Sequence, residues 1–383
     1  MGRRLARKSQ REANAPLMFD IWENERESIA RRRRSAAGFM QITKQRKVIN
    51  FWKGDLCMAS TYSDAGIDVK KAVRIHEAMA KIIAGTKNEF CEGEFGHYAG
   101  IVKIGEEMIA ITNDGVGSKL LVAQKMKKFD TVGIDCVAMV VNDLICIGAK
   151  PIALVDYIAL QKQDETLVLE LMKGLAQGCV QSGCAIVGGE TAILPEIVNG
   201  FDLEATCIGR VEGGVVDGRI VKEGDAVVGL ASSGLHSNGY TLARKVLSME
   251  KWGKEMLTPA TIYVKPVLEM IKECEVHGLA NITGGAFSKM SRLTKRSGCG
   301  FLLDGVPTLP PIFAELRRGV PSDYEMYRTF NCGIGFCVVC EKEDAKKVIA
   351  VAKKYGIGAQ VIGQAIAKKD ILLKKDGKEI SLL

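Results

Sequence analysis

The sequence predicts an α/β protein, of the α+β type, with two domains. A strand, a glycine-containing turn and a helix follow one another several times along the chain, which is typical of this class. The chain has 383 residues, enough for two ordinary domains with sizeable cores. Glycine-rich segments favour linkers, and near the middle of the chain lie Gly209, Gly213, Gly214 and Gly218. We therefore expect one domain over residues 58–213 and a second over residues 214–383.

Residues 1–57 differ in composition from the rest of the chain. They hold 14 Lys and Arg residues against 6 Asp and Glu, which accounts for the whole net charge of +8. Four interpretations fit: a targeting presequence, a nucleic-acid-binding tail, a partner-binding helix over residues 21–34, and an over-long start before Met58. The acidic residues argue against a presequence. We favour the over-long start, because regular sequence begins near Met58, and we expect a poorly ordered segment.

The remaining residues have no net charge, so their composition gives no electrostatic argument for nucleic acid. No apolar run reaches the roughly 20 residues that a membrane-spanning helix needs. The 12 cysteines are scattered and do not form a zinc-binding set. Buried thiols in a reducing compartment explain them best, and we expect a cytoplasmic protein.

The segment from Ile109 to Lys119 predicts a strand followed by an anion-binding turn. The strand is apolar and ends in Asp114, where the chain turns. Gly115 and Gly117 let backbone N–H groups approach an anion closely, and successive N–H groups form a concave cradle. Lys119 adds a positive charge. Taken alone, the pattern also fits an ordinary turn with a capping aspartate.

The helix predicted from Thr131 onward is apolar almost all round, and such a helix is normally buried. It nevertheless carries Asp135, Asn142 and Asp143. Residues seven apart return to the same face, so Asp135 and Asn142 point one way and Asp143 lies beside them. Carboxylates are rarely buried unless they are paired or bind a metal. Oxygen ligands near an anion-binding turn suit Mg²⁺ bound together with a nucleotide phosphate.

The rest of the first half alternates between helices and strands. The predicted helices cover residues 67–84 and 165–182, and the predicted strands cover residues 99–104, 152–159, 184–187 and 202–211. The glycine-bearing stretch 85–100 fits either a mobile lid or an ordinary connection. After residue 187, Gly188, Gly189 and Glu190 predict a second glycine turn, in which Glu190 fits either a metal ligand or a cap.

The second half repeats the pattern, and its most polar turn precedes a helix. Ser232–Tyr240 follows a predicted strand at 225–231 and contains hydroxyls, an amide and His236. Free N–H groups at a helix N-terminus favour phosphate, whereas a cap with a surface histidine fits the same residues. The other predicted elements are helices over 241–249, 262–273 and 343–355, strands over 300–303, 336–340 and 360–367, glycine turns at 281–285 and 331–335, and a terminal hairpin.

Eight short motifs occur in a fixed order along the chain. They are Ser63–Asp68, Thr112–Lys119, Val141–Asp143, Gln181–Cys184, Gly188–Ala192, Ser232–Tyr240, Asn281–Gly285 and Asn331–Gly335. Together they resemble the phosphoribosylformylglycinamidine cyclo-ligase family (AIR synthetases) of purine biosynthesis, over residues 58–383. Each motif alone is weak, but eight in register are highly specific.

The resemblance implies a homodimer of two-domain subunits. The N-terminal, ATP-binding domains of two subunits would join their sheets in a central barrel, and a C-terminal α/β sandwich domain would cover the cleft. It also implies a reaction in which ATP and formylglycinamidine ribonucleotide give 5-aminoimidazole ribonucleotide, ADP and phosphate, with Mg²⁺ as the metal. No membrane partner is expected, and no nucleic acid for residues 58–383.

The resemblance also implies roles for residues singled out above. The metal ligands would be Asp114, Asp135, Asp143 and Glu190. ATP would contact Asp114, Gly115, Gly117, Lys119, Asn142, Gly188, Gly189 and Glu190. The substrate would contact Ser233, His236, Ser237, Asn238, Thr283 and Gly284. The catalytic residues would be Asp114, His236 and Asn238.

Two positions depart from the family pattern. Where the family often has His-x-Thr-Gly-Gly-Gly, this chain has Asn281 at the start and Ala286 at the end. The alternative function is another Mg²⁺-ATP enzyme of the same superfamily, such as thiamine-monophosphate kinase or selenophosphate synthetase. A further hypothesis is a non-catalytic nucleic-acid-binding protein acting through residues 1–57, which the neutral body argues against.

Overall fold

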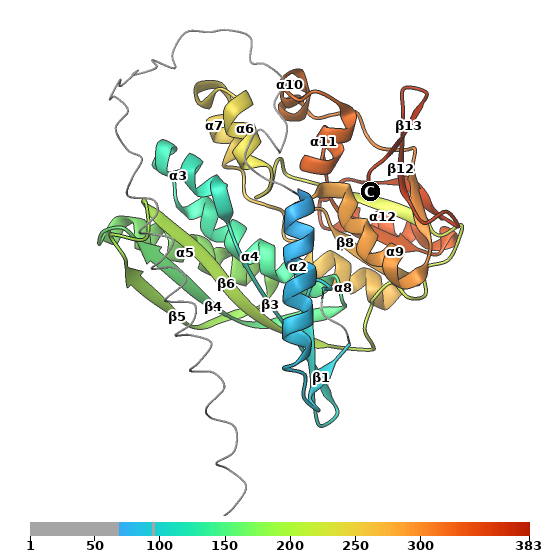
Figure 1. Cartoon of the computed structure of the whole chain (residues 1–383), viewed down its shortest axis with the longest axis horizontal. Helices are drawn as coiled ribbons and strands as arrows, with labels where there is room; N and C mark the ends of the chain where they lie inside the picture. The colour runs from blue at the N-terminus through green and yellow to red at the C-terminus, as the bar shows by residue number, and fades with distance from the viewer. Residues whose placement is uncertain (1–68, 94–95) are drawn as a thin grey trace, which may run out of the picture. The chain divides into compact units, whose positions relative to one another are not determined.

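The computed structural model describes residues 69–93 and 96–383 (Figure 1). The expectations for residues 1–68 lie outside this range. The described residues form two mixed sheets, with strand orders β1-β2-β3-β6-β4-β5 and β13-β12-β9-β11-β7-β10-β8. The predicted α/β class is confirmed. None of the helices in the described ranges is both long enough and apolar enough to cross a membrane.

The first sheet and its helices span residues 69–211. The helices are α2 (Val69–Ala84), α3 (Leu120–Met126), α4 (Asp130–Ile145) and α5 (Glu165–Ser182), with a 3₁₀ turn η1 (Gly117–Lys119). The strands are β1 (Cys91–Glu92), β2 (Gly100–Ile104), β3 (Glu107–Gly115), β4 (Ala149–Leu160), β5 (Ala185–Ile193) and β6 (Phe201–Val211). Paired strands are antiparallel except β4 and β5. A parallel pair needs a long crossover, which α5 provides.

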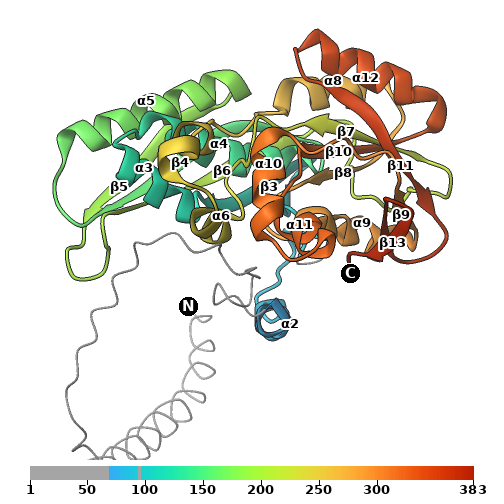
Figure 2. The same ribbon diagram turned by 90° about the horizontal axis from the view of Figure 1, so that it is seen from above.

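Helices α4 and α5 pack on one face of the first sheet (Figure 2). Nearly all of α4 is buried, which confirms the prediction from its apolar sequence. The two helices approach each other closely where Gly133 meets Gly174: a Cβ atom at Gly174 would lie 1.8 Å from the backbone oxygen of Asp130. The helix predicted over residues 165–182 has those bounds, because Asp164 caps its start by accepting a hydrogen bond from Leu167 N and Gly183 ends it.

The opposite face of the first sheet is exposed and partly apolar. Ile111 and Ile208 lie opposite each other on β3 and β6 and are 43% and 36% exposed. Val155, on β4, is 40% exposed. Isoleucine and valine side chains are more often buried, so this face is a candidate surface for contact with another protein chain.

The second sheet and its helices span residues 226–381. The strands are β7 (Ala226–Ala231), β8 (Val276–Asn281), β9 (Gly300–Leu303), β10 (Ile334–Cys340), β11 (Ala359–Ile366), β12 (Ile371–Lys375) and β13 (Lys378–Ser381). The helices are α6 (Tyr240–Val246), α7 (Met249–Met256), α8 (Val264–Glu273), α9 (Ser291–Ser297), α10 (Pro311–Gly319), α11 (Asp323–Thr329) and α12 (Ala345–Lys354), with 3₁₀ turns η2 (Ala286–Met290) and η3 (Lys342–Asp344). Figure 2 shows α8 and α12 on one side of this sheet and α9, α10 and α11 on the other.

The prediction of a glycine turn after residue 187 is wrong. Strand β5 continues without interruption through Gly188, Gly189 and Glu190. A Cβ atom at Gly189 would lie 2.5 Å from Oδ1 of Asp156, so this glycine makes room for a neighbouring side chain rather than for a turn. The unpredicted helices and strands are α3, α7, α9, α10, α11, β1 and β8. The five unpredicted helices have only seven to nine residues, too few for a clear apolar period.

Candidate functional site

Asp114 and Asp143 lie close to each other, at the end of β3 and in the last turn of α4. The backbone N–H of Gly115 donates to Asp114 Oδ1 (2.8 Å), and Asn281 Nδ2 donates to Asp143 Oδ1 (2.8 Å). Among the described residues, no donor bonds to the second oxygen of either carboxylate. The pKa of both groups is raised, to about 6 for Asp143; burial is the main cause, and the Asp114 charge contributes to the rise at Asp143. Of the four carboxylates expected at one metal site, the structure brings these two together.

The two positions that depart from the family pattern lie beside this pair. Asn281, at the end of β8, supplies a neutral amide donor to Asp143. Ala286 has a φ of +45°, a left-handed conformation that favours glycine. An L-residue in that conformation costs roughly 1–2 kcal/mol, so the turn keeps its shape at a small cost in stability.

Two cations of the second half, Lys289 in η2 and Arg292 in α9, face the same carboxylates. Each of them acts to lower the pKa of both Asp114 and Asp143. The Arg292 guanidinium lies 4.3 Å from the ring centre of Tyr98. Neither cation was predicted as a site residue from the sequence, because no motif contains them. The available signal was their spacing of three residues, about one helical turn, just after the glycine turn at 281–285.

The oxygen atoms of Asp114 and Asp143 fit Mg²⁺. Mg²⁺ prefers hard oxygen ligands and is usually held by one or two carboxylates together with substrate phosphates and water. In the described part of the chain, no three His, Cys, Asp or Glu side chains gather as a metal-binding group. A two-carboxylate site completed by a phosphate is therefore the arrangement that these residues fit.

Lys119 and Asp135 contact each other in the interior, away from that pair. The Lys119 Nζ lies 2.7 Å from Asp135 Oδ2, and neither side chain is exposed. The same ammonium group donates to the backbone oxygens of His236 (2.9 Å) and Thr258 (2.8 Å). These contacts use all three of its donors, which argues against the expected contact with phosphate. The remaining oxygen of Asp135 accepts from Ala260 N (2.8 Å), so its geometry does not support the expected metal ligation.

Asn142 lies on the same face of α4 as Asp135, as predicted. Its Nδ2 donates to Thr261 O (2.8 Å), and its Oδ1 accepts from Tyr263 N (2.9 Å). Both polar groups of the amide are thus used by backbone of the second half. Asn142 and Asp135 hold the segment 260–263 against α4, which does not favour the ATP contact expected for Asn142.

His236 is a buried acceptor rather than a surface histidine. Its side chain is 3% exposed, and its Nε2 atom lies 3.3 Å from Ser233 N and 3.4 Å from Thr261 N. Burial, and secondly the Lys119 charge, lower the pKa of His236 to about 3. A neutral imidazole that accepts backbone hydrogen bonds shapes the turn and does not attract phosphate by charge. Ser233 Oγ is also used internally, because it donates to Pro259 O.

Asn238 remains the best candidate in this turn for a contact to substrate. It lies beside Gly284, where a Cβ atom would be 3.2 Å from Asn238 Oδ1. Its Nδ2 is buried and has no hydrogen-bond partner among the described residues. Ser237 and Thr283 are also buried. A buried amide donor without a partner is rare, so a ligand acceptor at this place would satisfy it.

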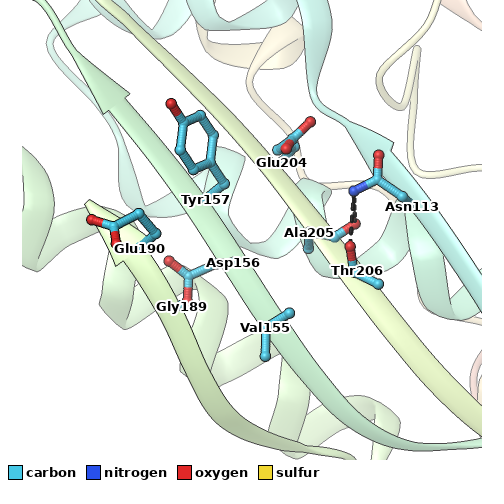
Figure 3. A pocket seen from close by; sticks show the side chains of 9 residues that line it. All are labelled: Asn113, Val155, Asp156, Tyr157, Gly189, Glu190, Glu204, Ala205 and Thr206. Atoms are coloured by element: carbon cyan, nitrogen blue, oxygen red, sulfur yellow. Dashed lines mark hydrogen bonds between the residues drawn. The ribbon is translucent and has the colours of Figure 1, made fainter. Parts of the chain in front are cut away.

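Glu190 lies on the exposed face of the first sheet (Figure 3). It is opposite Tyr157, which in turn is opposite Glu204. These side chains line a cavity of about 350 Å³ together with Asn113 and other residues. Asp114 is opposite Ala205, and because successive residues of a strand face opposite sides, the Asp114 and Glu190 side chains lie on opposite faces. The structure of this chain does not bring Glu190 to the other expected metal ligands.

Comparison with known families identifies both halves of the chain. Residues 96–211 match the model "AIR synthase related protein, N-terminal domain". Residues 222–375 match "AIR synthase related protein, C-terminal domain". The chain is 47% identical over 329 residues to a phosphoribosylformylglycinamidine cyclo-ligase of Methanocaldococcus jannaschii, covering 81% of this chain and 93% of the relative.

The chain belongs to the AIR synthase family. The resemblance inferred from the eight motifs is thereby confirmed. A cyclo-ligase of Methanococcus vannielii is 44% identical and covers 84% of this chain and 99% of its own length. One of Pyrococcus furiosus is 47% identical and covers 77% and 92%.

Solved structures share the fold of this AIR synthase family member at low identity. The "HypE-HypF complex" has a TM-score of 0.62 at 20% identity and covers 80% of this chain and 98% of that one. "AaThiL complexed with AMPPCP and TMP" has a TM-score of 0.61 at 17% identity and covers 82% and 96%. "T. maritima PurL complexed with FGAR" has a TM-score of 0.57 at 18% identity and covers 76% and 47%. These likenesses concern the fold alone.

Breaking the Lys119–Asp135 pair on one side should destabilise the protein strongly. Lys119→Met leaves a buried carboxylate without its partner, and we expect a loss of about 3–5 kcal/mol in the free energy of unfolding. The double variant Lys119→Met/Asp135→Leu should lose less than the sum of the single variants. Urea unfolding of all four proteins measures this coupling. Lys128→Met, which breaks an exposed pair with Asp130, is the control and should change stability by at most about 1 kcal/mol.

The buried His236 should make the protein sensitive to acid. Its pKa is lower in the folded protein than in the unfolded chain, so its contribution to stability is present above pH about 6.5 and is lost as the pH falls. One such group costs at most about 1.4 kcal/mol per pH unit. We expect the unfolding free energy of His236→Gln to fall less steeply than that of the wild type between pH 6.5 and 4.5. Parallel curves would show that His236 is not held neutral.

Proposed function

We propose that this chain catalyses the ATP-dependent cyclisation of formylglycinamidine ribonucleotide to 5-aminoimidazole ribonucleotide, with release of ADP and phosphate. The observation that carries the proposal is the Asp114–Asp143 pair facing Lys289 and Arg292, in a chain nearly half identical to proteins named for this cyclo-ligation. The pair supplies ligands for Mg²⁺, and the cations supply positive charge for phosphate. Phosphoryl transfer depends mainly on such positioning and charge neutralisation.

The proposed chemistry explains why ATP is consumed. The amide oxygen of the substrate is a poor leaving group, so transfer of the terminal phosphoryl group to it gives an iminophosphate and ADP. The amidine nitrogen that carries the ribose then attacks that carbon, the carbon–oxygen bond breaks, and phosphate leaves with the former amide oxygen. A proton lost from the attacking nitrogen completes the balance. No protein nucleophile is needed in this sequence.

The role of each residue follows from the oxygen atoms or N–H donors that it does not already use within the chain. Asp114 and Asp143 would hold Mg²⁺, which neutralises charge that develops on the phosphoryl oxygens when it is bound. The backbone N–H groups around Gly115 and Gly117 would face the phosphates. Asn238 and the turn at Thr283 and Gly284 would orient the substrate amide.

Asp143→Asn should reduce kcat by roughly a hundredfold or more, because a metal ligand contributes several kcal/mol to transition-state stabilisation. The amide can still accept the hydrogen bond from Asn281, so the variant should fold. Assays with Mg²⁺-ATP and the ribonucleotide should follow ADP and the aminoimidazole together. Asp304→Asn, an exposed position, is the matched control. ATP binding without cyclisation by the wild type would contradict the reaction and direct the test to thiamine-monophosphate and selenide as acceptors.

We also propose that two copies of this chain associate through the exposed face of the first sheet, joining the two sheets in a barrel. Ile111, Val155 and Ile208 support this, since they form an exposed apolar row on that face. A dimer would cover the cavity beside Glu190 and Glu204, so Glu190 would act at a site shared between subunits.

Introducing a charge on that face should prevent association. We expect Val155→Asp or Ile208→Asp to shift the protein from dimer to monomer in sedimentation velocity, because an aspartate would be buried without a partner. Val180→Asp on α5 is the control, since Val180 is 77% exposed on the other side of the sheet. A wild-type chain that sediments as a monomer at micromolar concentration would refute the proposed dimer.

A further inference from the structure

Lys289 and Arg292 have unused hydrogen-bonding capacity. In the described residues, neither makes a hydrogen bond or an ion pair, and the Arg292 guanidinium lies over the ring face of Tyr98. Burial lowers the pKa of Lys289, and so, secondly, does the positive charge of Arg292. Partly buried cations that lack a partner are costly, which points to a partner from outside the chain.

Other charges nearby are satisfied. On the same helix, Arg296 donates to Asp217 (3.1 Å), and deeper in the chain Lys119 is paired with Asp135. Beside the unpaired cations, Tyr98 is 3% exposed and its hydroxyl has no partner. Unsatisfied donors thus gather at one place, between the second half of the chain and the carboxylates of the first.

The two carboxylates and the two cations at this site carry equal and opposite charge. Asp114 and Asp143 carry two negative charges when ionised, and Lys289 and Arg292 carry two positive charges. Mg²⁺ alone would leave an excess of two positive charges, and a dianionic phosphate alone an excess of two negative charges. The metal and the phosphate together restore neutrality, so each should favour binding of the other.

We propose that Lys289 and Arg292 bind a phosphate group that shares Mg²⁺ with Asp114 and Asp143. This inference rests on the proposed function, and the phosphate belongs either to the nucleotide or to the ribonucleotide substrate. Lysine and arginine are common phosphate ligands, arginine through paired N–H donors. Because the carboxylates come from one half of the chain and the cations from the other, the bound phosphate connects the two halves.

Calorimetric titration of the full chain tests the proposal. Lys289→Met and Arg292→Met should each weaken binding of ADP with Mg²⁺ by about tenfold to a hundredfold, the effect of losing a charge-assisted hydrogen bond. The same variants should bind Mg²⁺ alone at least as tightly as the wild type, because a repelling charge is gone. A merely structural role would not give this opposite response. Lys295→Met, at an exposed position on α9, is the matched control.

A second titration, with ribose 5-phosphate, identifies the source of the phosphate. Weaker binding of ADP in the variants assigns it to the nucleotide, and weaker binding of ribose 5-phosphate assigns it to the ribonucleotide. Lys289→Arg keeps the charge and should retain most of the affinity, and thermal unfolding confirms that each variant is folded. If the folded variants bind ADP with Mg²⁺ and ribose 5-phosphate as tightly as the wild type, the proposed phosphate site is wrong but the proposed function still stands. A wild-type chain that binds neither probe would overturn the proposed function as well.

Discussion

The buried ion pair between Lys119 and Asp135 is the interaction on which the arrangement of the site depends. Its ammonium group also bonds to two backbone oxygens of the second half, at His236 and Thr258. Asn142 adds two further hydrogen bonds from the same helix. Helix α4 is thereby fixed against the second half, and α4 carries Asp143. A buried pair adds little net stability, but here it sets where Asp143 meets the residues that follow β8.

The buried and partly buried charged side chains around helix α4 fall into two groups, one fully bonded within the chain and one without an ion pair. Lys119 and Asp135 are fully buried and fully bonded. Asp114, Asp143, Lys289 and Arg292 are only partly buried and form no ion pair with one another. Burial raises the pKa of the two carboxyl groups and lowers the pKa of Lys289. Groups that could have neutralised each other are held apart. In the proposed function, these groups instead bind a metal ion and a phosphate, which together carry both signs of charge.

The sequence predicted long helices, and which of their residues share a face, better than it predicted which distant residues those side chains contact. Helix α5 was predicted with its bounds because eighteen residues give a clear period and its cap and glycine end are explicit. The shared face of Asp135 and Asn142 was also predicted correctly, since helical geometry determines it. What that face contacts depends on residues more than a hundred positions away, and spacing carries no information about them. For the same reason, the sequence did not indicate a role for Lys289 or Arg292. It also led to the prediction of a turn at Gly189, whereas this glycine provides space for the Asp156 side chain.

Two of the hydrogen-bond acceptors of Lys119 lie far from it along the sequence, which has a consequence while the chain is being synthesised. The ammonium group and Thr258 are 139 residues apart. While the ribosome is still making the second half, the Lys119 side chain can reach Asp135 but lacks two of its three acceptors. Until the later segment is made, water takes the place of these two acceptors, and the face of α4 that carries Asp135 and Asn142 stays uncovered. Such non-local contacts slow folding, and a nascent chain of this protein depends on remaining soluble through that interval.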